Sequence, residues 1–276
     1  FTFSLFPNIQ IYWLSFYKWN GISKAKQFIG FGNFQTILFL QPDFLRSVRN
    51  TILYILFLLF FVCVLGLVIA ILLKGNNKFN RFFRSYVFFP YVLSTVAVGL
   101  TWGYIFDPHL GMVSELLKLL NLPPITKDWL GIPGLGVFLI VVTHVWHGLG
   151  VPITISIAGL LNIPEMLYEA ASVEGCGSFK MFTKITLPLF MPTMTRLMLL
   201  NIGAGAMAFD YIFTIRNSML SMEYDTMSAY MYRMIQSTGL QNVGLPSAVG
   251  VLLSLFIFAV FMIQLVITKR IEFAIK

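Results

Sequence analysis

The sequence predicts an all-α, polytopic membrane helix bundle of about six transmembrane helices, with one helical loop on the cytoplasmic side. Only 11% of its 276 residues are charged, whereas a soluble domain carries about 25%. Hydrophobic residues make up 58% of the chain, and the mean hydropathy is +0.82. So few charged side chains cannot cover a globule of this size, which excludes a soluble enzyme.

Five segments are apolar and long enough to cross a bilayer as helices, which takes about 20 residues. They are 52–73, 85–106, 135–161, 197–215 and 243–268, and only Asp210 interrupts them with a charge. The segment 1–17 has no charge before it and no cleavage site after it, so we interpret it as the remainder of a sixth helix rather than a signal peptide. Because the chain starts at Phe1, an N-terminal piece is expected to be missing. Residues 1–276 are expected to form a single transmembrane domain.

The density of cations in the loops predicts the orientation. One side carries ten cations in short loops and at the C-terminus, namely Lys74, Lys78, Arg81, Arg84, Lys180, Lys184, Arg196, Lys269, Arg270 and Lys276. The other side carries nine in longer loops, namely Lys18, Lys24, Lys26, Arg46, Arg49, Lys118, Lys127, Arg216 and Arg233. We predict that the dense side is cytoplasmic. The net charge of +8 then follows from membrane topology, and no nucleic-acid partner is expected.

Small residues and prolines predict how the spans pack. Gly99 and Gly103, and likewise Ala204 and Ala208, have the small-xxx-small spacing that allows close helix contacts in lipid. The prolines Pro90, Pro152 and Pro246 are expected to start or break helices at membrane depth.

The predicted cytoplasmic loop at 162–192 differs from the other loops. Pro164 and Glu165 are typical of a first helical turn, and good helix formers follow as far as Val173. Gly175 and Gly177 are expected to end that helix. A second helix is predicted over 178–184, before Pro188 starts the next span. The loop is too apolar for an ordinary solvated connection, so we expect it to dock into a partner.

Seven residues of this loop form the pattern E-A-A-x₃-G-x₉-I-x-L-P, namely Glu169, Ala170, Ala171, Gly175, Ile185, Leu187 and Pro188. In this pattern the loop resembles that of binding-protein-dependent ABC importers. Further segments are similar to sugar permeases of the maltose-transporter type: S-F-Y-K-W-N-G at 15–21, F-I-G-F-G-N-F at 28–34, R-N-T at 49–51, L-L-N-I-P at 160–164 and F-D-Y-I at 209–212. Two segments depart from that family's pattern, Glu174-Gly175-Cys176 and the segment 214–218.

The resemblance implies a permease subunit in the cytoplasmic membrane of a bacterium or archaeon, importing a sugar or oligosaccharide. The partners it implies are a second homologous permease, a cytoplasmic ATPase dimer, and an extracellular or periplasmic solute-binding protein. ATP and Mg²⁺ would bind the ATPase, and this chain would hold no cofactor. Consistent with ATP binding by a separate subunit, the sequence contains no phosphate-binding G-x-x-x-x-G-K-[ST] loop. Its two isolated cysteines, Cys63 and Cys176, predict neither a metal site nor a disulfide.

The resemblance also implies roles within the loop. Glu169 would contact the ATPase, Ala170 and Ala171 would keep the helix slim, and Gly175 would form a tight turn. The alternative is that Glu169 only solvates a helix and Gly175 only caps it.

Candidate substrate residues come from the polar and aromatic side chains of the spans, because sugars bind by aromatic stacking and hydrogen bonds. They are Tyr91, Trp102, His144, Trp146, His147, Asn201 and Asp210. The alternative for His144 and His147 is a hydrogen bond between helices. For Asp210 we expect burial beside a structural partner such as an arginine.

Three other functions remain to be separated from sugar import. An ABC permease for a polyol or glycerol phosphate would need cations along its pathway. An ion-driven secondary transporter would need inverted repeats and ionisable groups near the midplane, and the spans hold almost no carboxylates. An intramembrane enzyme would need a catalytic or metal cluster, and no such cluster stands at helical spacing.

Overall fold

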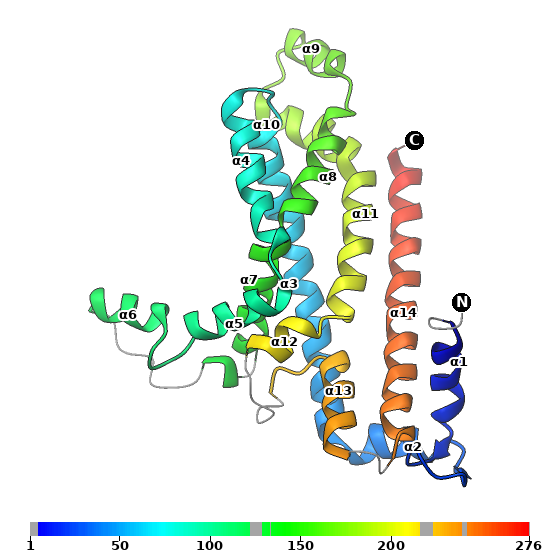
Figure 1. Cartoon of the computed structure of the whole chain (residues 1–276). Helices are drawn as coiled ribbons and strands as arrows, with labels where there is room; N and C mark the ends of the chain where they lie inside the picture. The colour runs from blue at the N-terminus through cyan, green and yellow to red at the C-terminus, as the bar shows by residue number, and fades with distance from the viewer. Residues whose placement is uncertain (1–4, 122–128, 133, 216–222, 239–241, 276) are drawn as a thin grey trace. The chain divides into compact units, whose positions relative to one another are not determined.

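The computed structural model describes residues 5–121, 129–132, 134–215, 223–238 and 242–275 (Figure 1). The predictions made for Lys127, Arg216, Lys276 and residues 1–4 lie outside that part of the chain. Two compact units emerge. Unit 1 is formed by Phe1–Leu56, Thr95–Thr143 and Ala204–Ala259, and unit 2 by Phe57–Ser94, His144–Gly203 and Val260–Lys276. Both units are almost entirely helical, which confirms the predicted fold class.

Four long helices contribute residues to both units: α3 (Pro42–Leu73), α7 (Leu135–Gly148), α11 (Leu187–Ala206) and α14 (Gly244–Ile275). Unit 1 adds α1 (Leu5–Leu14), β1 (Tyr17–Lys18), β2 (Gln27–Phe28), α2 (Gly32–Gln35), the π-helix η1 (Thr36–Leu40), α5 (Thr95–Ile105), α6 (Met112–Leu119), η3 (Trp129–Gly131), α12 (Asp210–Ile215) and α13 (Met227–Thr238). Unit 2 adds α4 (Lys78–Phe88), η2 (Phe89–Val92), α8 (Gly150–Leu161), α9 (Glu165–Val173), α10 (Ser178–Met181) and the π-helix η4 (Phe182–Thr186).

Among the described residues, three uninterrupted helices are long and apolar enough to cross a membrane: Pro42–Leu73, Ser178–Ala206 and Gly244–Lys269. Two broken pairs, Lys78–Val92 with Thr95–Ile105 (bent by 94°) and Leu135–Gly148 with Gly150–Leu161, bring the number to five when each pair is counted as one bent span. Counted in this way, they match the five long segments of the sequence. The predicted sixth helix, at 1–17, corresponds to α1, whose ten described residues are too few to cross a membrane by themselves.

Two predicted spans are broken rather than continuous, and a proline lies near each break. Pro152 cannot donate a backbone hydrogen bond and its ring crowds the preceding turn, and the pair α7–α8 bends by 59° just before it, around Leu149. Pro90 lies in the short 3₁₀ turn η2, after which helix stops at Leu93 and Ser94. Pro246, in contrast, lies in the first turn of α14, where a proline is tolerated.

The predicted span at 197–215 has the wrong boundaries. The helix starts at Ser178 and ends at Ala206, and Asp210 begins the separate short helix α12. The chain leaves the helix here because side chains replace the helical partners: the Ala208 carbonyl accepts hydrogen bonds from the hydroxyls of Thr226 (2.7 Å) and Ser228 (2.8 Å). Asp210 is exposed, so its expected burial beside an arginine is also wrong.

The small-residue spacing of α5 serves a close helix contact, as predicted. A Cβ atom added to Gly99 would collide with the Thr214 side chain, and one added to Gly103 would collide with the Ile215 carbonyl oxygen. Both partners belong to α12, so the short helix that follows the fifth span packs directly on the backbone of α5.

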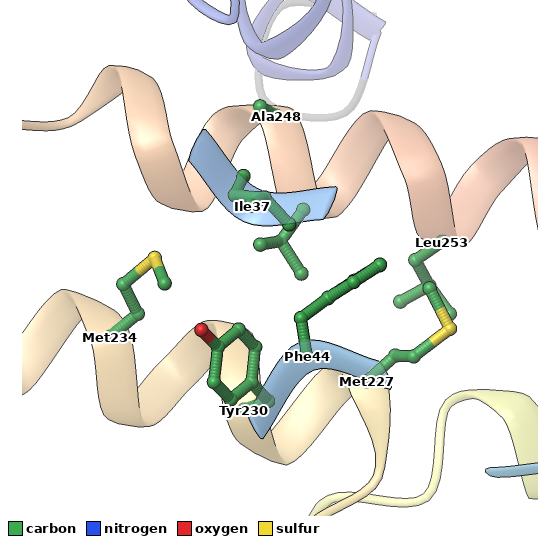
Figure 2. Packing of buried hydrophobic residues seen from close by; sticks show 8 residues of the cluster. Ile37, Phe44, Met227, Tyr230, Met234, Ala248 and Leu253 are labelled. Carbon is green, nitrogen blue, oxygen red and sulfur yellow. The ribbon is translucent and has the colours of Figure 1, made fainter. Parts of the chain in front are cut away.

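A buried cluster joins four helical segments of unit 1 (Figure 2). Ile37 of η1 and Phe44 at the start of α3 insert between α13 and α14 and are 0% and 2% exposed. The helices contribute Met227, Tyr230, Met234, Ala248, Val249 and Leu253. This packing fixes the N-terminal ends of α3 and α14 relative to α13.

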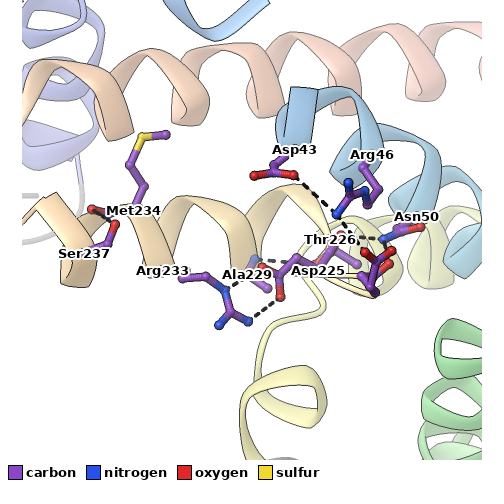
Figure 3. A network of polar contacts seen from close by, with 10 residues as sticks. Asp43, Arg46, Asn50, Asp225, Thr226, Ala229, Arg233, Met234 and Ser237 are labelled. Atoms are coloured by element: carbon purple, nitrogen blue, oxygen red, sulfur yellow. Dashed lines mark hydrogen bonds and ion pairs between the residues drawn. The ribbon is translucent and has the colours of Figure 1, made fainter. Parts of the chain in front are cut away.

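A polar network beside this cluster holds the segment 223–227 against α3 (Figure 3). The Asn50 amide donates hydrogen bonds to the carbonyls of Glu223 (2.8 Å) and Asp225 (3.1 Å). The Thr51 hydroxyl accepts one from the Met227 N–H (2.9 Å). Asn50 and Thr51 belong to the R-N-T segment, whose structural role the sequence did not reveal.

The same network contains a buried ion pair between Asp225 and Arg233. The guanidinium donates from Nε (2.6 Å) and from its terminal nitrogen (2.7 Å), and the Asp225 side chain is only 1% exposed. Burial raises the pKa of the Asp225 carboxyl, and the hydrogen bonds from Arg233 oppose that rise. A second pair, between Arg46 and Glu223 (3.1 Å), is more exposed.

Candidate functional site

The loop between α8 and α11 is built from ordinary helix-capping rules. Pro164 precedes α9 with an extended backbone (φ −60°, ψ 131°), and Glu165 occupies the first turn. A carboxylate there stabilises the positive end of the helix. The predicted first helix of the loop is therefore confirmed, with Glu169, Ala170 and Ala171 on its second and third turns.

Gly175 ends α9 in a Schellman motif. The Cys176 N–H donates to the Ala171 carbonyl (2.9 Å), and the Gly175 N–H donates to the Ser172 carbonyl (3.0 Å). The motif needs a left-handed residue at its centre, and Gly175 has φ +78°. A Cβ atom at Gly175 would meet nothing within 4 Å. Within the chain, the requirement for glycine is therefore one of backbone conformation, not of space.

Gly177 plays a different part from the one predicted. Its backbone is in the ordinary extended region (φ −70°, ψ 160°), and it precedes α10 instead of ending α9. A Cβ atom there would also meet nothing within 4 Å. Gly175 alone accounts for the turn between the two helices.

The second helix of the loop does not stop before Pro188, contrary to the prediction. α10 continues through the π-helix η4 into α11, so that one helix runs from Ser178 to Ala206. The Leu187 N–H reaches back five residues to the Phe182 carbonyl. A π turn changes the register of the backbone hydrogen bonds, which lets Pro188 lie in a continuous helix without breaking it.

A hydrogen bond braces the two halves of the loop. The Tyr168 hydroxyl lies 2.9 Å from the Thr186 hydroxyl, which joins α9 to the start of the fifth span. Thr186 is 8% exposed. On the same tyrosine, Lys74 Nζ lies 5.6 Å from the ring centroid. The loop is therefore held to the span by side chains outside the fixed positions of the motif.

The outer surface of the loop combines a carboxylate with apolar side chains. Glu169 and Ala170 are exposed, whereas Ala171 is 9% exposed and packs inward. Met166, Val173 and Phe179 are exposed by 71%, 87% and 81%. Ile185, Leu187 and Pro188 are half-buried at the base of the loop. We define the exposed group of Met166, Glu169, Val173 and Phe179 as the loop tip.

Five of the predicted substrate residues lie in unit 2, and His147 is structurally engaged. His147 is 5% exposed and its Nε2 lies 3.1 Å from the Leu93 carbonyl oxygen, at the break of the third span. The Tyr91 ring lies 6.2 Å from that of His147. This contact is the interhelical hydrogen bond given as the alternative for His147. His144 neighbours it one turn earlier on α7.

The remaining candidates are in different surroundings. Trp146 is 44% exposed, and the Asn201 amide donates to the Leu197 carbonyl of its own helix (2.8 Å). Trp102 and Asp210 belong to unit 1, where the Trp102 ring packs on Phe106 (5.2 Å between centroids). A role in substrate binding stays a prediction for all seven residues.

Several residues of the site were not predicted from the sequence. Tyr168 and Thr186 are one example. A second is Arg84 of α4, whose guanidinium donates to the Leu73 carbonyl at the end of α3 and to the Gly75 carbonyl just after it. Cations cap helix ends when they lie in or next to the last turn, but Arg84 is eleven residues beyond Leu73, so no local signal points to it. The pairing of Tyr168 with Thr186 has no such signal either.

The broken spans and the glycine-capped loop together define a permease of the binding-protein-dependent type. Residues 62–273 match the family model described as binding-protein-dependent transport system inner membrane component. The chain belongs to this family.

Relatives of this chain include several named sugar permeases. The multiple sugar-binding transport system permease protein MsmF of Streptococcus mutans is 28% identical over 271 residues, which cover 98% of this chain and 91% of MsmF. The arabinooligosaccharides transport system permease protein AraP of Bacillus subtilis is 29% identical over 268 residues, covering 96% and 83%. The sn-glycerol-3-phosphate transport system permease protein UgpA of Pectobacterium atrosepticum is 26% identical over 200 residues, covering 72% and 66%.

A solved structure has the same fold. The crystal structure of a bacterial alginate ABC transporter, in complex with an alginate pentasaccharide-bound periplasmic protein, contains a chain similar to this one with a TM-score of 0.81. The identity is 22%, and the match covers 97% of this chain and 89% of that chain.

Proposed function

We propose that this chain is the permease subunit of an ATP-driven importer that moves a sugar or oligosaccharide into the cytoplasm. The observation that carries the proposal is the loop: every fixed position of the E-A-A pattern is present, and Gly175 has the left-handed backbone that the turn between its helices requires. Membership in the permease family supports the same function.

In this proposal the loop tip transmits movement from a cytoplasmic ATPase dimer. Exposed apolar side chains in water mark a docking surface, and Met166, Val173 and Phe179 supply them beside the Glu169 carboxylate. Glu169 contacts the ATPase, Ala170 leaves room for a close approach, and Gly175 holds the angle between α9 and α10. The Tyr168–Thr186 hydrogen bond passes the displacement to the fifth span.

In this proposal, other subunits bind ATP, complete the pathway and deliver the solute. ATP and Mg²⁺ bind the partner ATPase, because the sequence has no phosphate-binding loop. A second permease completes the pathway. The low burial of α14 supports a second permease, since only 11% of the most apolar stretch of this helix is buried within the chain. An extracellular or periplasmic binding protein delivers the solute, and the loop faces the cytoplasm.

The solute class rests on the relatives. MsmF and AraP are named for sugars and arabinooligosaccharides, and the Tyr91 ring, which is 50% exposed, is an aromatic surface of the kind on which sugars stack. A second candidate is glycerol phosphate, because UgpA is also a relative. A phosphate group needs cations in the pathway, and the described parts of the five long spans contain few.

Reconstitution tests this proposal. The tagged chain is purified with the subunits that accompany it and placed in vesicles containing ATP, and uptake of labelled arabinooligosaccharide, maltose or sn-glycerol 3-phosphate is measured with the cognate binding protein. We expect uptake of a sugar that stops without ATP. Uptake of glycerol phosphate alone would favour the second candidate. Uptake driven by an ion gradient without ATP would contradict both.

A further inference from the structure

Unit 1 contains an apolar cavity of about 330 Å³ that the import mechanism does not use. It lies between α1, α13 and the start of α14. Ile11 and Leu14 line it from α1, Ile235 from α13, and Val243 and Pro246 from the start of α14. The volume is within the range of about 300–1,000 Å³ typical of small-molecule sites. In a membrane helix bundle, an apolar cavity open to the surface accommodates a hydrocarbon chain.

A cationic hairpin stands at one end of this cavity. β1 and β2 pair antiparallel, with Tyr17 opposite Phe28. Lys18 belongs to β1, and the segment between the two strands carries Lys24 and Lys26. All three lysines are exposed. Asp43 is the first acidic residue of the sequence, so residues 1–42 contain no carboxylate side chain to neutralise them. We call residues 17–28 the basic hairpin.

The basic hairpin is attached to the wall of the cavity. The Val243 N–H donates to the Trp19 carbonyl (2.7 Å), and Val243 itself lines the cavity. The buried Asn33 amide donates to the carbonyls of Ser15 (2.8 Å) and Tyr17 (3.0 Å). These contacts hold the lysines beside the end of the cavity formed by Leu14 and Val243.

Aromatic rings around Lys26 mark this end as a membrane–water boundary. Lys26 Nζ lies 4.6 Å from the Trp13 ring centroid and 4.3 Å from that of Trp19. Tryptophan and tyrosine gather at the headgroup level of a bilayer, and lysine there reaches toward lipid phosphates. The apolar cavity is therefore followed, at its end, by the cationic surface of the basic hairpin. A phospholipid has the matching arrangement, an apolar acyl chain followed by a charged headgroup.

We propose that this cavity and the basic hairpin bind one anionic phospholipid. An acyl chain lies between α1 and α13, and the phosphate pairs with Lys18 and Lys24, while Lys26 is held by the two tryptophans. Charge complementarity selects the anionic lipid, because the hairpin has cations and no acid to balance them. The predicted orientation puts this site in the outer leaflet of the cytoplasmic membrane. The site does not depend on the transported solute.

Lipid analysis of the purified chain with its accompanying subunits tests the site. The protein is reconstituted in vesicles of phosphatidylcholine containing phosphatidylglycerol, purified again in mild detergent, and the retained lipid is measured by mass spectrometry. We expect wild type to retain phosphatidylglycerol in preference to phosphatidylcholine. Replacing Lys18, Lys24 and Lys26 by Gln should lower retention about tenfold or more, because each surface lysine adds to the attraction of anionic lipid.

A second variant tests the cavity independently of charge. Ile235→Trp fills it from α13, where Ile235 is 48% exposed, and should displace the lipid without changing the charge. Ile9→Trp is the matched control, because Ile9 is 66% exposed on α1 and does not line the cavity. Lys118→Gln is the control for charge. Thermal unfolding shows that each variant is folded.

Two results would overturn the proposal. One is retention in wild type that does not distinguish phosphatidylglycerol from phosphatidylcholine, or that neither set of substitutions changes. The other is cross-linking of a photoreactive residue at Ile235 to the second permease, which would show that a protein helix occupies the cavity.

Discussion

Among the fixed positions of the E-A-A motif, Gly175 is the one whose residue type follows most directly from the backbone conformation. Its neighbours leave open space around it, so a larger side chain would fit. Its φ of +78° is what excludes other residues, because a left-handed backbone costs an L-residue about 1–2 kcal/mol. The sequence pattern predicts a turn at Gly175, but it does not show whether space or backbone conformation requires glycine there.

Substitutions at Gly175 should follow backbone preference rather than size. Gly175→Ala is expected to disturb the angle between α9 and α10 and to lower ATP-driven uptake in vesicles. Gly175→Asn should retain more uptake than Gly175→Ala, because asparagine tolerates the left-handed region. Gly177→Ala is the control, since Gly177 has φ −70° and free space. Equal losses for the alanine and asparagine variants would contradict the conformational explanation.

The hydroxyl pair of Tyr168 and Thr186 permits a measurement of coupling between α9 and the fifth span. Tyr168→Phe and Thr186→Val each remove one hydroxyl. We expect each to lower stability by about 0.5–1.5 kcal/mol, and the double variant to cost less than the sum, because the two act on one bond. Thermal unfolding of the purified complex gives the four values of the cycle. Strict additivity would show that the hydroxyls do not interact.

At the scale of elements, the network of Figure 3 explains why R-N-T stands at the start of α3. Asn50 and Thr51 use side chains to satisfy the backbone of the segment 223–227. Buried backbone groups outside helices need such partners. The segment is therefore held by residues more than 170 positions away in the chain, a pairing that no local pattern in the sequence could predict.

The ion pair at the start of α13 should be far more important for stability than an exposed pair. Asp225→Ala leaves Arg233 without its carboxylate, and breaking a buried pair costs about 3–5 kcal/mol. Glu115→Gln is the control, because the Glu115–Lys118 pair is more than half exposed and is worth about 0–1 kcal/mol. Chemical or thermal unfolding in detergent compares the two. Similar losses for both variants would contradict a structural role for the Asp225 pair.

The positions of the helices were predicted better than their ends. Apolar segments reveal where spans lie, and α3 and α14 confirm this. The fifth span was misplaced because its first nine residues, 178–186, carry Lys180 and Lys184 and resemble a loop in sequence. The π turn that accommodates Pro188 has no sequence signature. The breaks at Leu93 and Leu149 follow from prolines that were noticed, but charge-free runs of 22 and 27 residues favoured continuous helices.

At the scale of the whole molecule, composition was sufficient to predict a membrane protein, and the loop pattern was sufficient to predict the family. The orientation that the loop charges predict stays a prediction. The substrate residues were not predictable in the same way. Polar side chains such as His147 serve helix contacts as readily as ligands, and Asp210 proved to be exposed at the start of a short helix.

The two native cysteines allow the orientation to be tested without new cysteines. Cys176 is half-buried next to the loop turn, and Cys63 is buried within α3. A membrane-impermeant maleimide is expected to label Cys176 in inside-out vesicles and not in right-side-out vesicles. Bound ATPase should slow the labelling, whereas Cys63 should stay unlabelled on both sides. Labelling of Cys176 from outside would reverse the predicted topology.

The continuous helix from Ser178 to Ala206 joins the E-A-A loop to a transmembrane span. At about 1.5 Å per residue, Asn201 lies roughly 35 Å along the helix from Ser178. In the proposed mechanism, a force on Phe179 therefore acts directly on the helix that carries Asn201 into the span.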